Sequence, residues 1–403
     1  MATQDFEDIS TISAATTASV DTYKETRNEN DRQLSLENAR ALVRALENPA
    51  DAIFKLFLLP TVLMAVKTAS DLGIFAVLSP STTFVTCQQL ATQESADIHL
   101  VERIMRVLVY NGFAAEHGPS QYLPTPWTHQ MTVRETLGTM DSLFIDFPPI
   151  IHKTPDFLKS INYQNPGDPN NGPLQYAYKT SGTCWDWLGE NPEALSRFNT
   201  FMEGTRAGTA HWADWFPVQK ELLDGTVAGR PLLVDVGGGR GHELAGFKER
   251  FPSAMGGLVL EDLPSIIDDI EQLDDSIQRV KHDFFTPQPV KYARVYYLKH
   301  IMHDWSDGNC RIILGHITAA MEMGYSKILI EDHIVPDQNA GSRDTLVDMI
   351  VMVWCPGIER TRQQWRDLLK STGLVVTNFW LTEGHSRGII QAELLGKPGK
   401  LFH

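Results

Sequence analysis

The residues that decide the fold are Leu232-Leu233-Val234-Asp235-Val236-Gly237-Gly238-Gly239-Arg240-Gly241-His242. In this stretch an apolar run ends in a valine, four glycines occupy five positions, and a helical pattern begins near His242. Glycine allows a sharp turn and lets a ligand approach the backbone closely. A strand, a glycine-rich turn and a helix in this order predict a cofactor site. A tight turn without a ligand would account for only one or two of the glycines.

The spacing of these glycines restricts the kind of cofactor. Gly237, Gly239 and Gly241 form a GxGxG pattern, which differs from the GxGxxG of dinucleotide-binding proteins and leaves an NAD-type site as an alternative. The loop lacks the Gly-Lys-Ser/Thr sequence of nucleoside triphosphate-binding loops, so we do not expect an NTP site.

Strand and helix patterns alternate after this loop. We expect strands over residues 232–236, 257–260, 279–282, 294–298, 327–331, 375–381 and 388–394, with helical stretches between the first five. This alternation predicts an α/β fold, Rossmann-like and doubly wound, with a mostly parallel seven-stranded sheet. Such sheets bind ligands at the carboxyl ends of their strands.

Acidic residues follow the second and third expected strands. Asp262 stands roughly 20 residues beyond the glycine loop, where a carboxylate commonly holds a ribose diol. A solvated carboxylate that caps the helix starting at Pro264 is the alternative. After the third strand, Asp283 could accept a hydrogen bond from an adenine amino group and Phe284 could stack on the ring, although for Phe284 taken alone a core position is the better interpretation.

His303 follows the fourth expected strand, on the side of the sheet edge that binds ligands. A histidine with a pKa near ~6.5 is mostly neutral at pH 7 and can accept a proton from a phenol. Adjacent helical residues do not face each other, so we do not expect Asp304 to orient the ring. We expect Glu331, at the end of the fifth strand, and Glu359 to do so. The alternatives are a solvated strand end for Glu331 and an exposed turn for Glu359.

The region before the glycine loop is predicted to be mainly helical. Helices over 36–46 and 52–72, a short helix at 87–90, a helix capped by Asp97 and a hairpin over 113–123 form a winged-helix pattern. The expected recognition helix carries only two basic residues, so dimerisation or a substrate lid is favoured over DNA binding. The predicted domains are a flexible tail (1–35), a winged-helix-like dimerisation domain (36–130), a helical linker and substrate-pocket region (131–225) and a cofactor domain (226–403).

Composition and charge exclude several classes of protein. The chain has 403 residues and a formal net charge of −15, from 35 basic and 50 acidic residues, which argues against a nucleic-acid partner. The four cysteines are far apart and form no CxxC pair, so we expect neither a disulfide framework nor a metal site, and a reducing, cytoplasmic location. The most apolar stretch, residues 56–66, is too short to span a membrane, and we interpret it as a buried helix or a subunit interface.

A set of motifs over most of the chain resembles a known family. These motifs are VDVGGGRGH (234–242), EDLP (261–264), HDFF (282–285), LKHIMHDWSD (298–307), IEDHIVP (330–336), ERT (359–361) and, upstream, FNTFM (198–202). In this order they resemble the class I S-adenosylmethionine-dependent O-methyltransferases of the plant caffeic-acid/flavonoid type, in their fungal secondary-metabolism branch. The resemblance covers roughly residues 36–397. The stretch over residues 353–357 is one residue shorter than in the plant pattern, so the resemblance does not imply the identity of the substrate.

The resemblance implies S-adenosylmethionine as cofactor and a homodimer formed through the N-terminal domain. It implies that the cofactor-binding residues are Gly237, Gly238 and Gly239 for the methionine part, Asp262 for the ribose, Asp283 and Phe284 for the adenine, and Lys299 nearby. It implies His303 as catalytic base with Glu331 and Glu359 beside it. The implied substrate residues are Phe198, Met202, Met352 and Trp354.

The expected reaction is methyl transfer to a phenolic or enolic hydroxyl of a polyketide or aromatic secondary metabolite, without metal or membrane. Two alternatives stay open. Some members of the fungal branch resemble methyltransferases but use the sulfonium charge to assist dehydration or pericyclic ring closure, and in such a site His152 could supply an acid. The second alternative is a non-catalytic regulator with a winged-helix domain. The excess of acidic residues in the chain argues against it.

Overall fold

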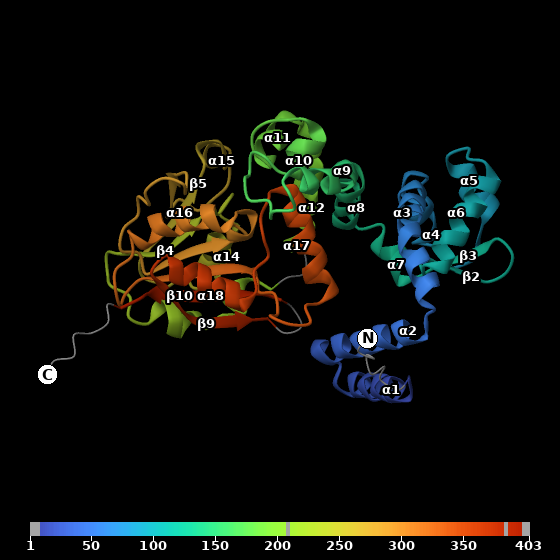
Figure 1. Ribbon diagram of the computed structural model, residues 1–403, viewed down its shortest axis with the longest axis horizontal. Helices are drawn as coiled ribbons and strands as arrows, with labels where there is room; N and C mark the ends of the chain where they lie inside the picture. Colours follow the sequence, from blue (N-terminus) through green and yellow to red (C-terminus); the bar gives the residue numbers. More distant parts are fainter. Residues whose placement is uncertain (1–8, 207–209, 383–385, 397–403) are drawn as a thin grey trace. The chain divides into compact units, whose positions relative to one another are not determined.

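The computed structural model describes residues 9–206, 210–382 and 386–396 (Figure 1). The chain divides into two compact units. The first comprises residues up to Pro148 together with Asn191–Ala207, and the second comprises Pro149–Glu190 and the chain from Gly208 onward. Each unit is described below by itself.

The first unit is mainly helical and contains a small antiparallel sheet. The sheet is formed by β1 (Val85–Thr86), β2 (Ala114–Glu116) and β3 (Gln121–Pro124) in the order β1-β3-β2. The helices of this unit are α1 (Ile9–Thr26), α2 (Glu29–Leu46), α3 (Pro49–Asp71), α4 (Ile74–Leu78), α5 (Cys87–Gln93), α6 (Ile98–Tyr110), α7 (Pro126–Gln130), α8 (Arg134–Asp141), η1 (Ser142–Asp146) and α12 (Pro192–Arg206). The order of helices and hairpin confirms the winged-helix-like prediction.

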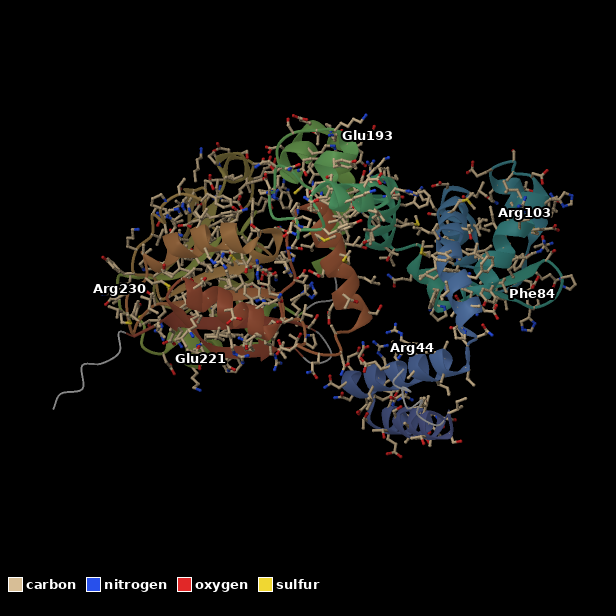
Figure 2. All side chains as sticks on the ribbon, in the orientation of Figure 1. Arg44, Phe84, Arg103, Glu193, Glu221 and Arg230 are labelled. Atoms are coloured by element: carbon tan, nitrogen blue, oxygen red, sulfur yellow. The ribbon has the colours of Figure 1, made fainter. Side chains whose placement is uncertain are left out.

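Capping residues fix where the winged-helix elements begin. Thr86 accepts from the Gln89 N–H at the start of α5, and Asp97 accepts from two backbone N–H groups at the start of α6. The basic side chains of α6 are Arg103, labelled in Figure 2, and Arg106, both exposed. This sparse positive charge is a poor match for a phosphate backbone.

The structure corrects the prediction of a flexible tail over residues 1–35. Residues from Ile9 onward form α1 and α2, which pack against each other, while residues 1–8 lie outside the described part of the chain. The polar composition suggested a tail, but these side chains bond within the helix pair. Ser35 donates to the Asp31 carbonyl at 2.7 Å, and Asn38 donates across to Ser19 at 3.1 Å.

Helix α3 is apolar and largely exposed. The prediction of a buried helix over residues 56–66 is wrong for this chain by itself, since Leu56 is 60% and Phe57 73% exposed. The alternative, a subunit interface, fits such a surface. Helix α3 is also long and apolar enough to cross a bilayer, which is weak evidence on its own because helices of soluble proteins pass the same criterion.

The second unit is built on a seven-stranded sheet. Its strands are β4 (Pro231–Val236), β5 (Gly257–Asp262), β6 (Ile277–Lys281), β7 (Val295–Lys299), β8 (Lys327–His333), β9 (Leu374–Leu381) and β10 (Arg387–Leu394). Their order is β6-β5-β4-β7-β8-β10-β9, with β4 to β8 parallel and β10 antiparallel to both neighbours. The predicted α/β fold and all seven predicted strands are confirmed.

The second unit also contains helices. They are α9 (Phe147–Ser160), α10 (Pro173–Tyr178), α11 (Cys184–Glu190), α13 (Trp212–Trp215), η2 (Gln219–Leu223), α14 (His242–Arg250), α15 (Pro264–Asp268), α16 (Asp307–Thr318), α17 (Ser342–Trp354) and α18 (Arg362–Ser371). Side chains alternate along the strands, so β8 contributes Leu329 to one buried cluster and Ile328 and Ile330 to the other. The sheet therefore holds its carboxyl ends rigidly at one edge.

The segment between β6 and β7 differs from the prediction. We expected a helix there, but residues 282–294 contain none. Pro287 and Pro289 remove backbone donors that a helix needs. The Tyr296 hydroxyl instead donates to the Val290 carbonyl at 2.8 Å, and Gln288 donates to Glu261 at 2.8 Å.

Candidate active site

The glycine loop joins β4 to α14 at the carboxyl edge of the sheet. The backbone N–H groups of Gly237 and Gly238 both donate to the Glu261 carbonyl, at 2.8 and 3.1 Å. A Cβ on Gly238 would lie 2.5 Å from the Asp235 carboxyl carbon, so no side chain fits there. Gly239 has a φ of +59° and open space where its Cβ would be. The loop therefore presents bare backbone to an open side.

Asp235 lies beneath this loop and is fully buried. Neither of its carboxyl oxygens has a hydrogen-bond partner among the described residues, and burial raises the pKa of this carboxyl well above its usual range. A buried polar group of this kind normally finds a partner. The open loop and the unpartnered carboxyl together fit a ligand that carries hydrogen-bond donors.

Asp262, at the end of β5, is held against the same loop. Its carboxylate accepts from the Gly239 N–H at 2.8 Å and from the Leu263 N–H at 2.7 Å. Burial raises the pKa of Asp262 and outweighs these two hydrogen bonds, which lower it. The carboxylate is thus fixed where a ribose diol was predicted to bind.

The residues predicted to hold the adenine follow β6. Phe284 is near the glycine loop, since a Cβ on Gly237 would lie 3.6 Å from its ring. Its ring also meets Trp305 edge-on, with centroids 6.0 Å apart. Asp283 is exposed and accepts from the Phe285 N–H at 2.9 Å. The structure therefore brings this pair to the same edge of the sheet as the loop.

Lys299, at the end of β7, forms a partly buried ionic cluster with acids on two elements. Its ammonium lies 2.7 Å from Glu243 on α14 and 3.4 Å from Glu331 on β8. Glu331 also accepts a hydrogen bond from the Tyr297 hydroxyl. Glu331 is 3% exposed, so it is not a solvated strand end.

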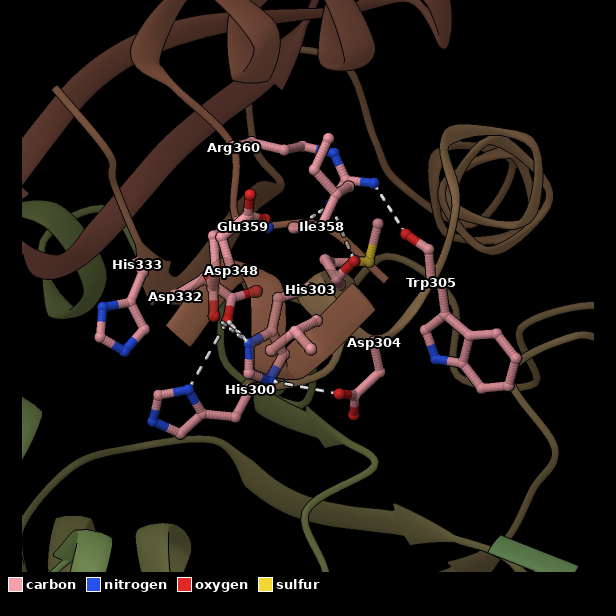
Figure 3. A network of polar contacts seen from close by, with 12 residues as sticks. His300, His303, Asp304, Trp305, Asp332, His333, Asp348, Ile358, Glu359 and Arg360 are labelled. Carbon is pink, nitrogen blue, oxygen red and sulfur yellow. Dashed lines mark hydrogen bonds and ion pairs between the residues drawn. The ribbon is translucent and has the colours of Figure 1, made fainter. Parts of the chain in front are cut away.

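His303 lies in a short 3₁₀ turn, Met302–Asp304, that follows β7. Its Nδ1 is 2.8 Å from Glu359 Oε1, in hydrogen-bond contact. Glu359 is 4% exposed, which excludes the exposed-turn alternative. The predicted pairing of His303 with Glu359 is therefore present in the structure (Figure 3).

Two other acids near His303 differ from the prediction. Glu331 does not face His303. Asp332, its neighbour, does, with Oδ1 3.7 Å from Nδ1. Successive side chains of a strand point to opposite faces, so the prediction was one residue out of register. Asp304 also lies close, with Oδ1 3.5 Å from Nε2. Because both residues lie in a 3₁₀ turn, the side chain of Asp304 comes close to the His303 ring. The prediction had assumed an α-helix, in which adjacent residues do not face each other.

Arg360 fixes the turn that carries His303, and sequence reasoning did not assign it a role. It is fully buried and donates to the carbonyls of Met302 at 2.9 Å and Trp305 at 2.8 Å (Figure 3). The Ile358 N–H donates to the His303 carbonyl at 2.8 Å. A Cβ on Gly357 would lie 2.0 Å from that carbonyl, so glycine is required for the close approach.

The acids around His303 decide its charge. Burial lowers the pKa of His303, but the carboxylates of Asp332, Asp304 and Glu359 outweigh it and hold the pKa well above the usual value. Burial raises the pKa of Asp332 to about 7. For Glu359, burial raises the pKa, and the facing His303 more than offsets this and lowers it. The site therefore stabilises a histidine that has gained a proton.

The four predicted substrate residues fall into the two units. Met352 and Trp354 are on α17 of the second unit, and Trp354 packs edge-on against Trp187 with centroids 5.8 Å apart. Residues 162–172 pass beside the His303 turn, since a Cβ on Gly167 would lie 3.4 Å from Ser306. Phe198 and Met202 are on α12 of the first unit. His152 is exposed on α9.

Comparison with protein families gives two matches. Residues 175–375 match an O-methyltransferase domain, and residues 54–133 match an O-methyltransferase dimerisation domain. The second match includes most of α3 and the winged-helix elements.

Several known proteins are similar over nearly the whole chain. O-methyltransferase penC of Penicillium thymicola is 38% identical, over 91% of this chain and 93% of its own. Demethylsterigmatocystin 6-O-methyltransferase of Aspergillus flavus is 30% identical, over 92% and 95%. Among solved structures, LepI in complex with SAM is 27% identical with a TM-score of 0.83, over 96% of this chain and 99% of its own. A structure described as a pericyclic reaction enzyme is 26% identical with a TM-score of 0.83, over 96% and 100%.

Proposed function

Because this chain belongs to the O-methyltransferase family and uses S-adenosylmethionine, we propose that it methylates a phenolic or enolic hydroxyl of a polyketide or aromatic acceptor, with His303 as general base. The observation that carries this proposal is the 2.8 Å contact between His303 Nδ1 and Glu359. A carboxylate there keeps the proton on Nδ1, so Nε2 has a lone pair free to accept the proton of the acceptor.

The residues around the glycine loop fit the cofactor. We assign the methionine part to Gly237, Gly238 and Gly239, the ribose to Asp262, and the adenine to Asp283 and Phe284. The bare backbone at Gly239 and the unpartnered carboxyl of Asp235 support this assignment. Lys299 supports the loop through Glu243 on α14. The bound cofactor supplies an electrophilic methyl group on a sulfonium.

The acids beside His303 have separate tasks in this proposal. Glu359 orients the ring, and Asp332 lies close enough to stabilise the imidazolium that forms after proton transfer. Glu331 acts on the cofactor side, where it bonds Tyr297 and pairs with Lys299. His303 must lose its own proton before each reaction, since its pKa is raised.

The acceptor would contact Met352 and Trp354 on α17. Phe198 and Met202 are assigned to the acceptor on the strength of the resemblance alone. We also propose that the exposed apolar surface of α3 is the homodimer interface, because it lies in the family's dimerisation domain. A cytoplasmic location is proposed from the four cysteines, all free and buried.

A cyclase that uses the sulfonium charge without methyl transfer is the second candidate. The similarity to a pericyclic reaction enzyme favours it. The intact set of His303, Glu359 and Asp332 favours methyl transfer, because a proton acceptor is what a hydroxyl nucleophile needs.

The test is incubation of the purified protein with methyl-labelled cofactor and a panel of phenolic and enolic polyketides. We expect label in the product, and His303→Gln should lower kcat by roughly 10²–10⁴-fold with cofactor affinity unchanged. Wild-type turnover by His303→Gln would remove this residue from the role of base. Product without label or demethylated cofactor would instead establish the cyclase.

A further inference from the structure

His300 lies close to Asp332 and to the proposed base His303, so that polar atoms of three residues approach one another. Its Nδ1 lies 3.6 Å from Asp332 Oδ1, and His303 Nδ1 lies 3.7 Å from the same oxygen (Figure 3). One ligand atom of each of the three residues lies within 4.8 Å of the other two. Two imidazoles and a carboxylate that converge in this way form a potential set of metal ligands.

Two of the three residues in this set offer atoms without a hydrogen-bond partner in the described part of the chain, while Nδ1 of the third, His303, is bonded to Glu359 at 2.8 Å. Among the described residues, His300 Nδ1 and both carboxyl oxygens of Asp332 accept or donate no hydrogen bond, and Asp332 is completely buried. Buried polar groups are nearly always satisfied, so three such atoms at one point indicate a missing ligand. His333 is not part of the converging set, and its Nδ1 bonds Ser386 at 3.0 Å.

We propose that His300, His303 and Asp332 bind a divalent transition-metal ion of the zinc class, and that this ion inhibits the enzyme. Bonds of ~2.0–2.1 Å in a tetrahedral site put neighbouring ligand atoms roughly 3.3 Å apart, close to the two measured separations. Nitrogen ligands favour zinc-class ions over magnesium and calcium. Glu359 Oε2, buried and without a partner among the described residues, is a candidate fourth ligand.

Inhibition follows from the two nitrogens of one ring. In the form bonded to Glu359, Nδ1 of His303 carries the proton and has no free lone pair. An ion that binds Nδ1 needs that lone pair, so the ring's proton moves to Nε2. A ring protonated on Nε2 has no lone pair for the proton of the acceptor. The inhibitory consequence rests on the proposed role of His303, whereas the metal site does not.

The three side chains differ in exposure. The side chains of His300 and His303 are 17% and 16% exposed, and Asp332 is 0% exposed. The histidine rings therefore form the outer part of the site, while His300 Nδ1 and both carboxyl oxygens of Asp332 are themselves buried. The sequence showed no ligand spacing because the ligands come from two strand ends, after β7 and within β8.

The experiment uses the full chain, produced without a polyhistidine tag and treated with a chelator that is then removed. Titration with Co²⁺ should give one ion per chain with the intense visible absorption of tetrahedral coordination, and Zn²⁺ should displace it. His300→Asn and Asp332→Asn should each weaken Co²⁺ binding at least about 10-fold. Asparagine suits position 300 because His300 has a φ of +52°.

His99→Asn is the matched control. It removes an exposed histidine whose Nδ1 lies 3.4 Å from Glu102, and it should leave the stoichiometric site unchanged. Circular dichroism of each variant checks that it is folded. A wild-type chain that binds no stoichiometric Co²⁺, or binding that is equally tight in both site variants, overturns the proposal. The binding result stands whether or not any phenol is methylated, so failure of the proposed function is scored separately.

Discussion

His303 shows how a single residue's chemistry depends on its surroundings. Three carboxylates raise its pKa, so the fraction of neutral base grows only as the pH rises through that raised value. The low-pH limb of kcat/KM should therefore lie above pH ~6.5, the unperturbed histidine value.

Asp304→Asn should move this limb toward lower pH, because removing a negative charge 3.5 Å from Nε2 lowers the pKa of His303. The measurement is kcat/KM against pH for both proteins. Asp268→Asn, an exposed acid paired with Lys281, is the control and should leave the profile in place. A profile unchanged in Asp304→Asn would mean that another group sets the limb.

At the residue scale, the sequence predicted which elements carry the acids of the site, but not which of two consecutive acids on β8 faces His303. The pairing of His303 with Glu359 was expected, and the family resemblance also implied it; the structure contains it. Glu331 and Asp332 were harder to separate, since both are acids at a strand end and only the pleat decides which faces the histidine. His300 was not predicted as part of the site. Its backbone has a left-handed conformation, which sequence patterns do not show.

At the scale of elements, the central strands β4, β7 and β8 were predictable because each is a buried apolar run, whereas the edge strands β6 and β9 are largely exposed. The segment over residues 282–294 was not, because its structure depends on bonds to Tyr296 and Glu261 from other parts of the chain. The glycine loop combines both kinds of information: its position is visible in the sequence, and the need for each glycine is visible only in the packing.

Gly238→Ala tests that need. The added Cβ would lie 2.5 Å from the Asp235 carboxyl, which is buried and cannot move aside, so the loop should deform and cofactor affinity should fall at least about 10-fold. Calorimetric titration with S-adenosylhomocysteine measures this. Gly315→Ala on α16, where a Cβ meets nothing within 4 Å, should bind normally. Equal affinity in both variants would show that the loop tolerates a side chain.

At the scale of the whole molecule, the apolar surface of α3 is the feature that a single chain leaves unexplained. Phe57 is 73% exposed within the family's dimerisation domain. Phe57→Glu would place a charge in the proposed interface and should convert the dimer to a monomer, measured by light scattering after gel filtration. Met255→Glu, an equally exposed apolar position in the second unit, should stay dimeric. A dimeric Phe57→Glu would move the interface elsewhere.

Helix α1 and the first part of α2 were missed at this same scale, whereas the predicted helix over residues 36–46 forms the second part of α2. Their sequence lacks the apolar periodicity of a core helix, and their pairing depends on small and hydroxyl side chains such as Ser19 that the composition made resemble a tail. Charge patterns alone could not distinguish the two cases.

The end of β8 places consecutive acids on opposite faces, Glu331 toward Lys299 and Asp332 toward His303. A one-residue insertion or deletion inside this strand would exchange the two faces and disable both. Residues 162–172, by contrast, form a segment without regular structure, where added length costs little. The length of that segment is therefore free to vary, while the length of β8 is fixed by the two acids that it has to position on opposite faces.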